Sequence, residues 1–129
     1  MPIFLKFLPS LKQLLMHMNK ITDIKPLCCK EFSNLEVLDL GANKIQQLPN
    51  AFVHFLGKLI QLTLSNNDLG QLPHLLGFHK NLRNLSVDGN PLKSIRRTII
   101  DKGTDAILKF LKDKFIDGKD DMIEEWALV

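Results

Sequence analysis

The sequence has little of what metal, redox and nucleotide sites are built from. Its two cysteines, Cys28 and Cys29, are adjacent, so they supply neither a disulfide framework nor the paired spacing of a zinc site. Neither G-x-G-x-x-G nor G-K-[ST] occurs, which removes the usual phosphate-binding loops. We therefore expect no metal, no cofactor and no small-molecule substrate, and two free thiols in a reducing compartment.

Long hydrophobic runs are also missing. No stretch approaches the roughly 20 consecutive apolar residues that a membrane-spanning helix needs. The apolar opening residues are interrupted by Lys6 and Pro9, with no charged leader before them and no small-residue cleavage site after them. We expect a cytoplasmic protein, with the nucleus open as a second compartment.

Length and charge set the remaining bounds. A chain of 129 residues allows one domain, and a hydrophobic content of 45% is enough for a buried core. The net charge of +3 is too small to indicate nucleic acid by itself.

What is present is an internal repeat. Its best copy has the residues Leu35, Leu38, Leu40, Asn43, Ile45 and Leu48, followed by Pro49. The same pattern occurs four times, and its asparagines are Asn19, Asn43, Asn67 and Asn90. Because spacing and residue type are both kept at intervals of 24, 24 and 23 residues, the pattern indicates a repeat array.

The repeat spacing predicts the fold. Leu38 and Leu40 alternate as in a strand with one buried face. Every copy starts in the same direction after one full coil, so the strands must pair in parallel, and stacking must bury the leucines. The predicted fold is an α/β, right-handed leucine-rich repeat solenoid of about four repeats, with parallel strands on its concave face and a helical C-terminal cap.

Four segments are expected along the chain. They are a remnant of a preceding repeat at 1–10, four repeats at 11–95, the helical cap at 96–116 and a flexible acidic tail at 117–129. Thr104 is expected to cap a helix that carries Ile107 and Leu111 on its apolar side.

The N-terminal edge has no comparable cap in the sequence. The end of a solenoid otherwise exposes its leucines to water. We therefore expect self-association through the edge around Phe4, Phe7 and Leu11.

The repeated asparagines are expected to be structural. An amide has two donors and an acceptor, so it can satisfy backbone groups that a turning chain leaves unpaired. We predict an internal hydrogen-bond ladder, closed to ligands, at Asn19, Asn43, Asn67 and Asn90.

The candidate partner-binding surface lies between the buried leucines. By alternation, the intervening strand side chains point outward onto the concave face. These residues are Gln13, Leu15, His17, Val37, Asp39, Gln61, Thr63, Ser65, Asn84, Ser86 and Asp88. Leu15, Val37 and Ile60 form a small apolar patch that either anchors a partner or is ordinary surface hydrophobicity.

The expected distance between the candidate catalytic residues argues against an enzyme. His17, Asp39 and Ser65 have the residue types of a hydrolase triad. They fall on three successive strands about 4.8 Å apart, which puts Ser65 roughly 9–10 Å from His17. Proton transfer needs a separation of about 3 Å, so we predict that the protein is not an enzyme.

A second binding hypothesis concerns the basic cap. Its cationic residues are Lys93, Arg96, Arg97, Lys102, Lys109, Lys112, Lys114 and Lys119. Such a surface could bind an anionic membrane or nucleic acid. Acidic residues interleave it and no aromatic residues lie on its polar face, so both partners are disfavoured and a solvated helix face is favoured.

The repeats of 23–24 residues with Leu-Pro resemble the short intracellular leucine-rich repeat proteins, the family that includes Ras-pathway scaffolds. The segment from Leu85 to Thr104, followed by 106–112, is similar to a mid-chain cap that closes one repeat array before another begins. The resemblance implies a non-catalytic interaction scaffold in intracellular signalling that binds a protein partner through its concave face. Most upstream repeats of the family are missing, so an inactive fragment of a longer repeat protein is the alternative.

Overall fold

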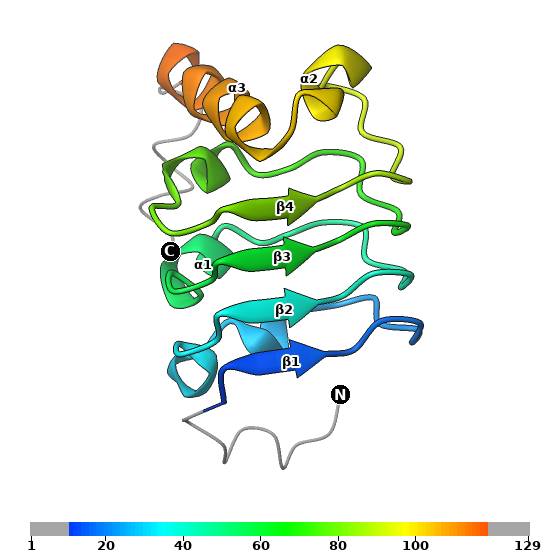
Figure 1. The fold of residues 1–129 in the computed structure, drawn as a ribbon, viewed down its shortest axis with the longest axis vertical. Helices are drawn as coiled ribbons and strands as arrows, with labels where there is room; N and C mark the ends of the chain where they lie inside the picture. Colours follow the sequence, from blue (N-terminus) through cyan, green and yellow to red (C-terminus); the bar gives the residue numbers. More distant parts are fainter. Residues whose placement is uncertain (1–10, 119–129) are drawn as a thin grey trace.

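A computed structural model describes residues 11–118, in which four coils stack into a solenoid (Figure 1). Each coil begins with a three-residue strand: β1 (Gln13–Leu15), β2 (Val37–Asp39), β3 (Gln61–Thr63) and β4 (Asn84–Ser86). The strands form one parallel sheet in chain order. Their register aligns the central leucines Leu14, Leu38, Leu62 and Leu85. The predicted right-handed solenoid with parallel strands is confirmed.

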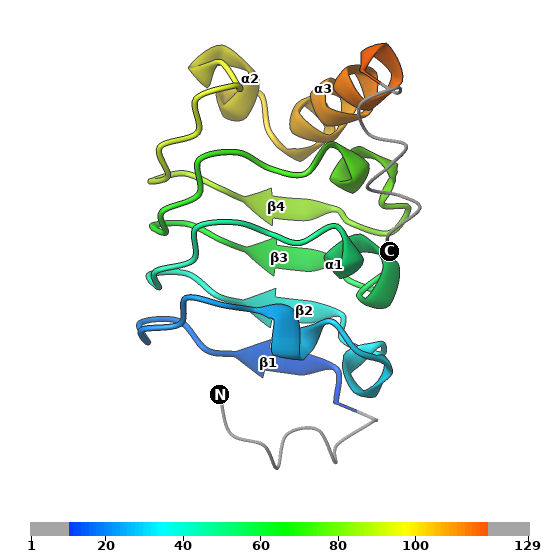
Figure 2. The same cartoon turned by 180° about the vertical axis from the view of Figure 1, so that it is seen from behind.

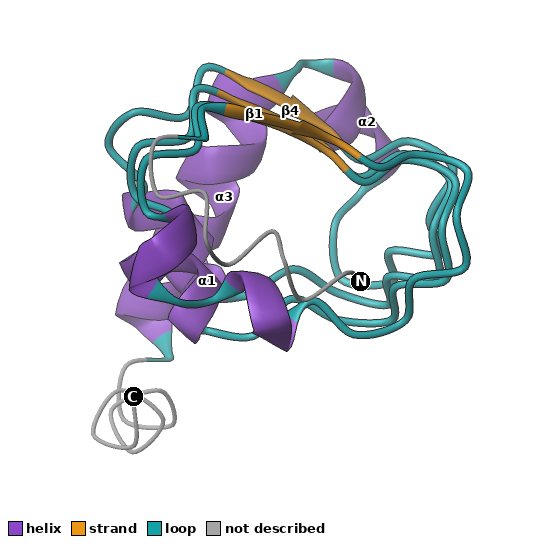
Figure 3. Cartoon of the chain, turned by 90° about the horizontal axis from the view of Figure 1, so that it is seen from below, coloured by secondary structure: helices purple, strands orange, loops and turns teal. Residues whose placement is uncertain are grey.

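The core lies between the strands and the outer segments of the coils. These segments contain α1 (Ala51–Phe55) and short 3-10 helices at Lys25–Leu27, Lys30–Phe32 and His74–Phe78 (Figure 2). Seen along the stack, α1 lies across the core from the strands (Figure 3). The outer segments contribute the buried side chains Leu27, Phe32, Phe52 and Leu76, which complete the core that the strand leucines begin.

Two helices cover the last coil, α2 (Arg97–Asp101) and α3 (Thr104–Asp117) (Figure 1). Ile107 and Leu111 of α3 are buried against the core. A glycine permits the close approach, because a Cβ at Gly77 would overlap the backbone of Lys112. α3 ends at Asp117, a residue that the sequence analysis assigned to the tail.

The prediction that Thr104 caps α3 through its side chain is wrong. The residue at the N-cap position is Gly103, and no side chain caps this helix. The Thr104 hydroxyl instead accepts a hydrogen bond from the Leu85 amide at 2.9 Å, and it lies 3.5 Å from the Leu85 carbonyl oxygen. The hydroxyl therefore bonds to the open edge of β4, and it makes no capping hydrogen bond at the N-terminus of α3.

Two of the predicted segments cannot be compared with the fold. The proposed repeat remnant at 1–10, including Phe4 and Phe7, lies outside the described residues, and so does the tail from 119 to 129.

Candidate functional site

The repeated asparagines bind backbone groups of two adjacent coils. Asn67 Nδ2 donates to the carbonyl oxygens of Leu40 at 3.0 Å and Leu64 at 2.9 Å, and its Oδ1 accepts from the Ile45 amide at 3.1 Å. Asn43 and Asn90 make the equivalent bonds, each to its own coil and to the coil before it. Their amides are therefore occupied with holding the stack.

Asn19 differs from the other three asparagines. It is exposed, and its amide donates to the carbonyl oxygens of Met16 at 2.9 Å and His17 at 3.3 Å, both within its own coil. Among residues 11–118 there is no earlier coil for it to bridge.

The outward-facing residues of the strands and of the turns that follow them form the surface that we call the concave strand face. Strand register arranges the strand residues in two rows across the sheet, and the turn residues follow them as a third row. The first row is Gln13, Val37, Gln61 and Asn84; the second is Leu15, Asp39, Thr63 and Ser86. Beyond the strands the same repeat gives His17, Gly41, Ser65 and Asp88. All of these except the buried Gly41 are exposed or half-buried.

Two carboxylates on this face are held by neighbouring donors. Asp39 Oδ1 accepts from the Gly41 amide at 3.0 Å, and Asp39 Oδ2 lies 3.6 Å from His17 Nδ1. Asp88 Oδ1 accepts from the Ser65 hydroxyl at 2.6 Å. The three residue types of a hydrolase triad therefore do not form one hydrogen-bonded chain. His17 faces Asp39, whereas Ser65 donates to Asp88.

The apolar residues of the face gather near its β1 end. Leu15 is 64% exposed, and Val37 on the adjacent strand is half-buried. Met18 is 75% exposed and was missed by the sequence analysis. Its backbone φ is 57°, and the residue before the repeated asparagine has a positive φ and is exposed in every coil, as at Ala42, Asn66 and Gly89. That position in the repeat is the signal that could have identified Met18.

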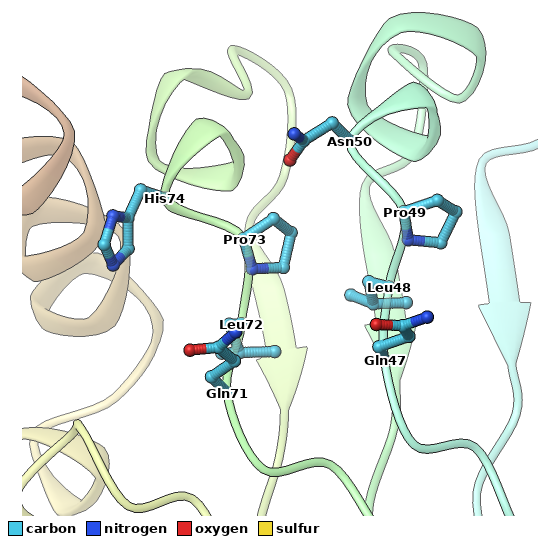
Figure 4. Close-up of a pocket in the computed structure, with 8 residues that line it drawn as sticks. All are labelled: Gln47, Leu48, Pro49, Asn50, Gln71, Leu72, Pro73 and His74. Atoms are coloured by element: carbon cyan, nitrogen blue, oxygen red, sulfur yellow. The ribbon is translucent and has the colours of Figure 1, made fainter. Parts of the chain in front are cut away.

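A second candidate surface lies on the flank of the stack, where two coils repeat the same residues. Gln47-Leu48-Pro49 and Gln71-Leu72-Pro73 line a shallow cavity of about 330 Å³, together with Asn50 and His74 (Figure 4). Leu48 and Leu72 are buried, so the accessible lining consists mainly of amides and proline rings. This cavity can form hydrogen bonds, but its lining contains no carboxylate or thiol.

A second cavity, of about 340 Å³, opens before the strands and is lined by Glu36, Lys58, Ile60, Asn81 and Arg83. Lys58 Nζ donates to Asn34 Oδ1 at 2.8 Å, and the Arg83 guanidinium donates to the Lys80 carbonyl oxygen at 3.1 Å. Its two cations therefore already have partners within the protein.

The thiols are not activated as nucleophiles. Burial raises the pKa of Cys28 to about 11, and the adjacent Cys29 adds to the effect. Burial also raises the pKa of Cys29. Since the thiolate is the reactive form, both cysteines are weak nucleophiles and weak metal ligands at neutral pH.

His79 is a core residue and does not face the candidate surfaces. It is buried, and its Nδ1 accepts from the amides of Leu82 at 3.1 Å and Asn81 at 3.3 Å. The proton must therefore be on Nε2, which lies 2.9 Å from the Leu56 carbonyl oxygen. Burial lowers the pKa of His79, although the bond to Leu56 partly opposes the shift.

Within residues 11–118, the acidic, cysteine and histidine side chains nowhere gather in a group of three that could hold a metal ion. The helices of this part of the chain are too short or too polar to cross a membrane.

Comparison with known proteins agrees with the observed coils. Residues 9–69 match the family model described as leucine rich repeat. Keratocan from Danio rerio is 33% identical over 88 residues, and human leucine-rich repeat-containing protein 56 is 41% identical over 61 residues. These matches cover 67% and 46% of this chain but 25% and 11% of the relatives, so the chain spans a quarter or less of either one.

A solved leucine-rich repeat protein from Leptospira interrogans superposes with a TM-score of 0.66 at 37% sequence identity. The superposition covers 79% of this chain and 26% of that protein. Together with the parallel sheet and the asparagines that bridge adjacent coils, the match shows that the fold is a leucine-rich repeat solenoid.

Proposed function

We propose that the protein is a non-catalytic scaffold that binds a protein partner through the concave strand face. The observation that carries the proposal is that different residues of each coil serve the core and the surface. The leucines and the bridging asparagines are used in the core, whereas the residues between them are presented to solvent in aligned rows. Leucine-rich repeat domains generally mediate protein–protein interactions, and solenoids offer extended concave surfaces for this purpose.

The size of the face limits the expected affinity. Three outward positions on each of four coils give far fewer contacts than the roughly 20–30 residues per side of a standard protein interface. We therefore expect this chain alone to bind weakly, and more tightly when further repeats extend the surface.

Affinity capture with two sets of substitutions tests the proposal. One variant changes Leu15, Val37, Asp39 and Thr63 on the concave strand face. The other neutralises Arg96, Arg97, Lys109 and Lys112 on the cap, which tests binding of an anionic membrane or nucleic acid. We expect the first variant to lose the captured partner and the second to keep it.

The opposite result would replace the concave-face proposal with the basic-cap alternative. Steep weakening of capture by salt would point the same way, because phosphate contacts release counterions. In the described structure, some cap cations are already engaged: Lys109 pairs with Asp113 at 3.0 Å, and Lys112 lies 5.5 Å from the Phe78 ring centroid.

The cellular setting is part of the same proposal. We place the scaffold in intracellular signalling, in the cytoplasm with access to the nucleus, on the basis of the adjacent free cysteines and the family resemblance. The segment 85–112 also resembles the mid-chain cap of leucine-rich repeat-containing protein 40. Capture by this chain should be compared with capture by one extended with upstream repeats; a partner captured by the extended chain alone would favour an inactive fragment.

Self-association through the N-terminal edge is a separate proposal. β1 is the first strand of the described sheet, and it pairs on one side with β2. Analytical ultracentrifugation over a range of concentrations should show a reversible dimer. A monomer at high concentration would contradict this proposal.

A further inference from the structure

We propose that the concave strand face recognises a protein segment that presents arginine or lysine side chains. This inference rests on the proposed function, because it specifies the chemistry of the partner bound at the same face. It follows from the charge of that face and from its two fixed carboxylates.

Charge is unevenly distributed over the molecule. The chain as a whole has a net charge of +3, yet the three rows of the concave strand face contain no lysine or arginine. With His17 neutral, the formal charges of these rows are those of Asp39 and Asp88. An approaching anion would therefore meet two carboxylates, whereas a cation would be attracted.

The two carboxylates are oriented before a partner arrives. Asp39 is fixed through Oδ1 by the Gly41 amide at 3.0 Å, and Asp88 through Oδ1 by the Ser65 hydroxyl at 2.6 Å. A carboxylate oxygen can accept more than one hydrogen bond, so both groups retain capacity for an ammonium or guanidinium donor. Because the side chains are already positioned, less rotamer freedom is lost when the partner binds.

Gly41 is buried and packs closely beside the Asp39 carboxylate. A Cβ at this position would lie 3.2 Å from Asp39 Oδ1, 3.5 Å from the Ser65 carbonyl oxygen and 3.5 Å from Thr63 Cγ2. A side chain here would thus press on the Asp39 carboxylate and displace it. Glycine at this position therefore lets the carboxylate keep the orientation that its bond to the Gly41 amide defines.

The neighbours of Asp39 suit the rest of such a side chain. Leu15 is the register partner of Asp39 on β1, and Thr63 is its register partner on β3. Lysine and arginine pack their methylene groups along apolar surface while the charged group stays in a polar environment. Leu15 can contact the methylene groups, and the Thr63 hydroxyl can accept a hydrogen bond from the charged end.

Titration of the isotope-labelled full chain with three N-acetylated ten-residue peptides tests the inference by NMR. The peptides alternate serine with arginine, glutamine or glutamate. At low salt, we expect the arginine peptide to bind most tightly and to shift the amide signals of Gly41, Ser65 and Ser86. Raising the ionic strength should weaken this binding, because exposed charges are screened.

Matched variants identify the groups responsible. Asp39→Asn and Asp88→Asn keep the oxygen that accepts the internal hydrogen bond, so the fold is retained while the charge is lost. Each should weaken binding of the arginine peptide about two- to fivefold, the range for an exposed ion pair. Asp101→Asn on α2 removes an exposed charge away from the face and should have no effect. Gly41→Ala should weaken binding with every charge in place.

Three results would overturn the inference. The glutamine peptide could bind the same amides as tightly as the arginine peptide, which would leave the proposed function standing without the charge preference. The arginine peptide could shift only signals of α2 and α3, or could fail to bind. In these last two cases the capture experiment with the Leu15, Val37, Asp39 and Thr63 variant decides separately whether the concave strand face binds protein.

Discussion

The Thr104 hydroxyl takes the place of a fifth strand beside Leu85. It accepts a hydrogen bond from the Leu85 amide at 2.9 Å and lies 3.5 Å from the Leu85 carbonyl oxygen. Within the sheet, a central strand residue uses its amide and carbonyl to pair with the next strand, and Leu85 is the last central residue of the described sheet. One side chain at the start of α3 therefore satisfies an edge that would otherwise attract another strand.

Replacing Thr104 with valine should destabilise the protein by about 1–2 kcal/mol, because the part-buried Leu85 amide loses its acceptor at little change in shape. Thr104→Ser keeps the hydroxyl and should be much closer to the wild type. Urea denaturation measures both free energies of unfolding. Thr98→Val on the exposed side of α2 is the control, and an equal loss in both valine variants would contradict the role of the hydroxyl.

The two environments of the repeated asparagines predict different costs for the same substitution. Asn67→Ala removes bonds to Leu40, Leu64 and Ile45 in the buried stack. The cost should be about 2–4 kcal/mol, since several buried backbone groups lose partners together. Asn19→Ala removes exposed bonds within one coil and should cost about 0.5 kcal/mol or less. Chemical denaturation of the two variants under identical conditions checks the difference, and similar losses would show that the bridges between coils contribute little.

The sequence predicts the repeated parts of the fold well and the single contacts poorly. The positions of Leu38 and Asn43 recur at fixed spacing in four copies. Because each copy has the same pattern, the sequence alone indicates how one coil packs against the next. Thr104 is not part of the repeat, and its local sequence equally suits a helix cap. Only the position of β4 therefore decides where its hydroxyl bonds. The same holds on the candidate face, where alternation identifies Ser65 and Asp88 as outward but cannot show that they bond each other.

Gly77 should be required for docking of the cap. Gly77→Ala places a Cβ against the backbone of Lys112, which cannot move without displacing α3. We expect a loss of about 1–3 kcal/mol, as for other overpacked sites. Amide hydrogen exchange should increase in α3 and in the segment His74–Phe78 while β2 remains protected. Gly70→Ala is the matched control, because nothing lies within 4 Å of the added Cβ, and unchanged exchange in α3 would refute the expected clash.

Stability should depend on pH through His79. Burial lowers the pKa of this residue in the folded protein, against the opposing bond to Leu56, so the folded state resists protonation more than the unfolded chain. Above the ordinary pKa of about 6.5 the neutral ring contributes fully to stability. As the pH falls from about 6.5 towards the lower folded pKa, the unfolded chain takes up a proton first and that contribution is lost. Protonation would also turn Nδ1 from the acceptor of two backbone amides into a donor facing them.

The free energy of unfolding of the wild type should therefore fall more steeply than that of His79→Gln between about pH 7.5 and pH 5.5. His54→Gln, which changes an exposed histidine of α1, should follow the wild type. Parallel slopes for wild type and His79→Gln would show that the buried ring does not govern this dependence.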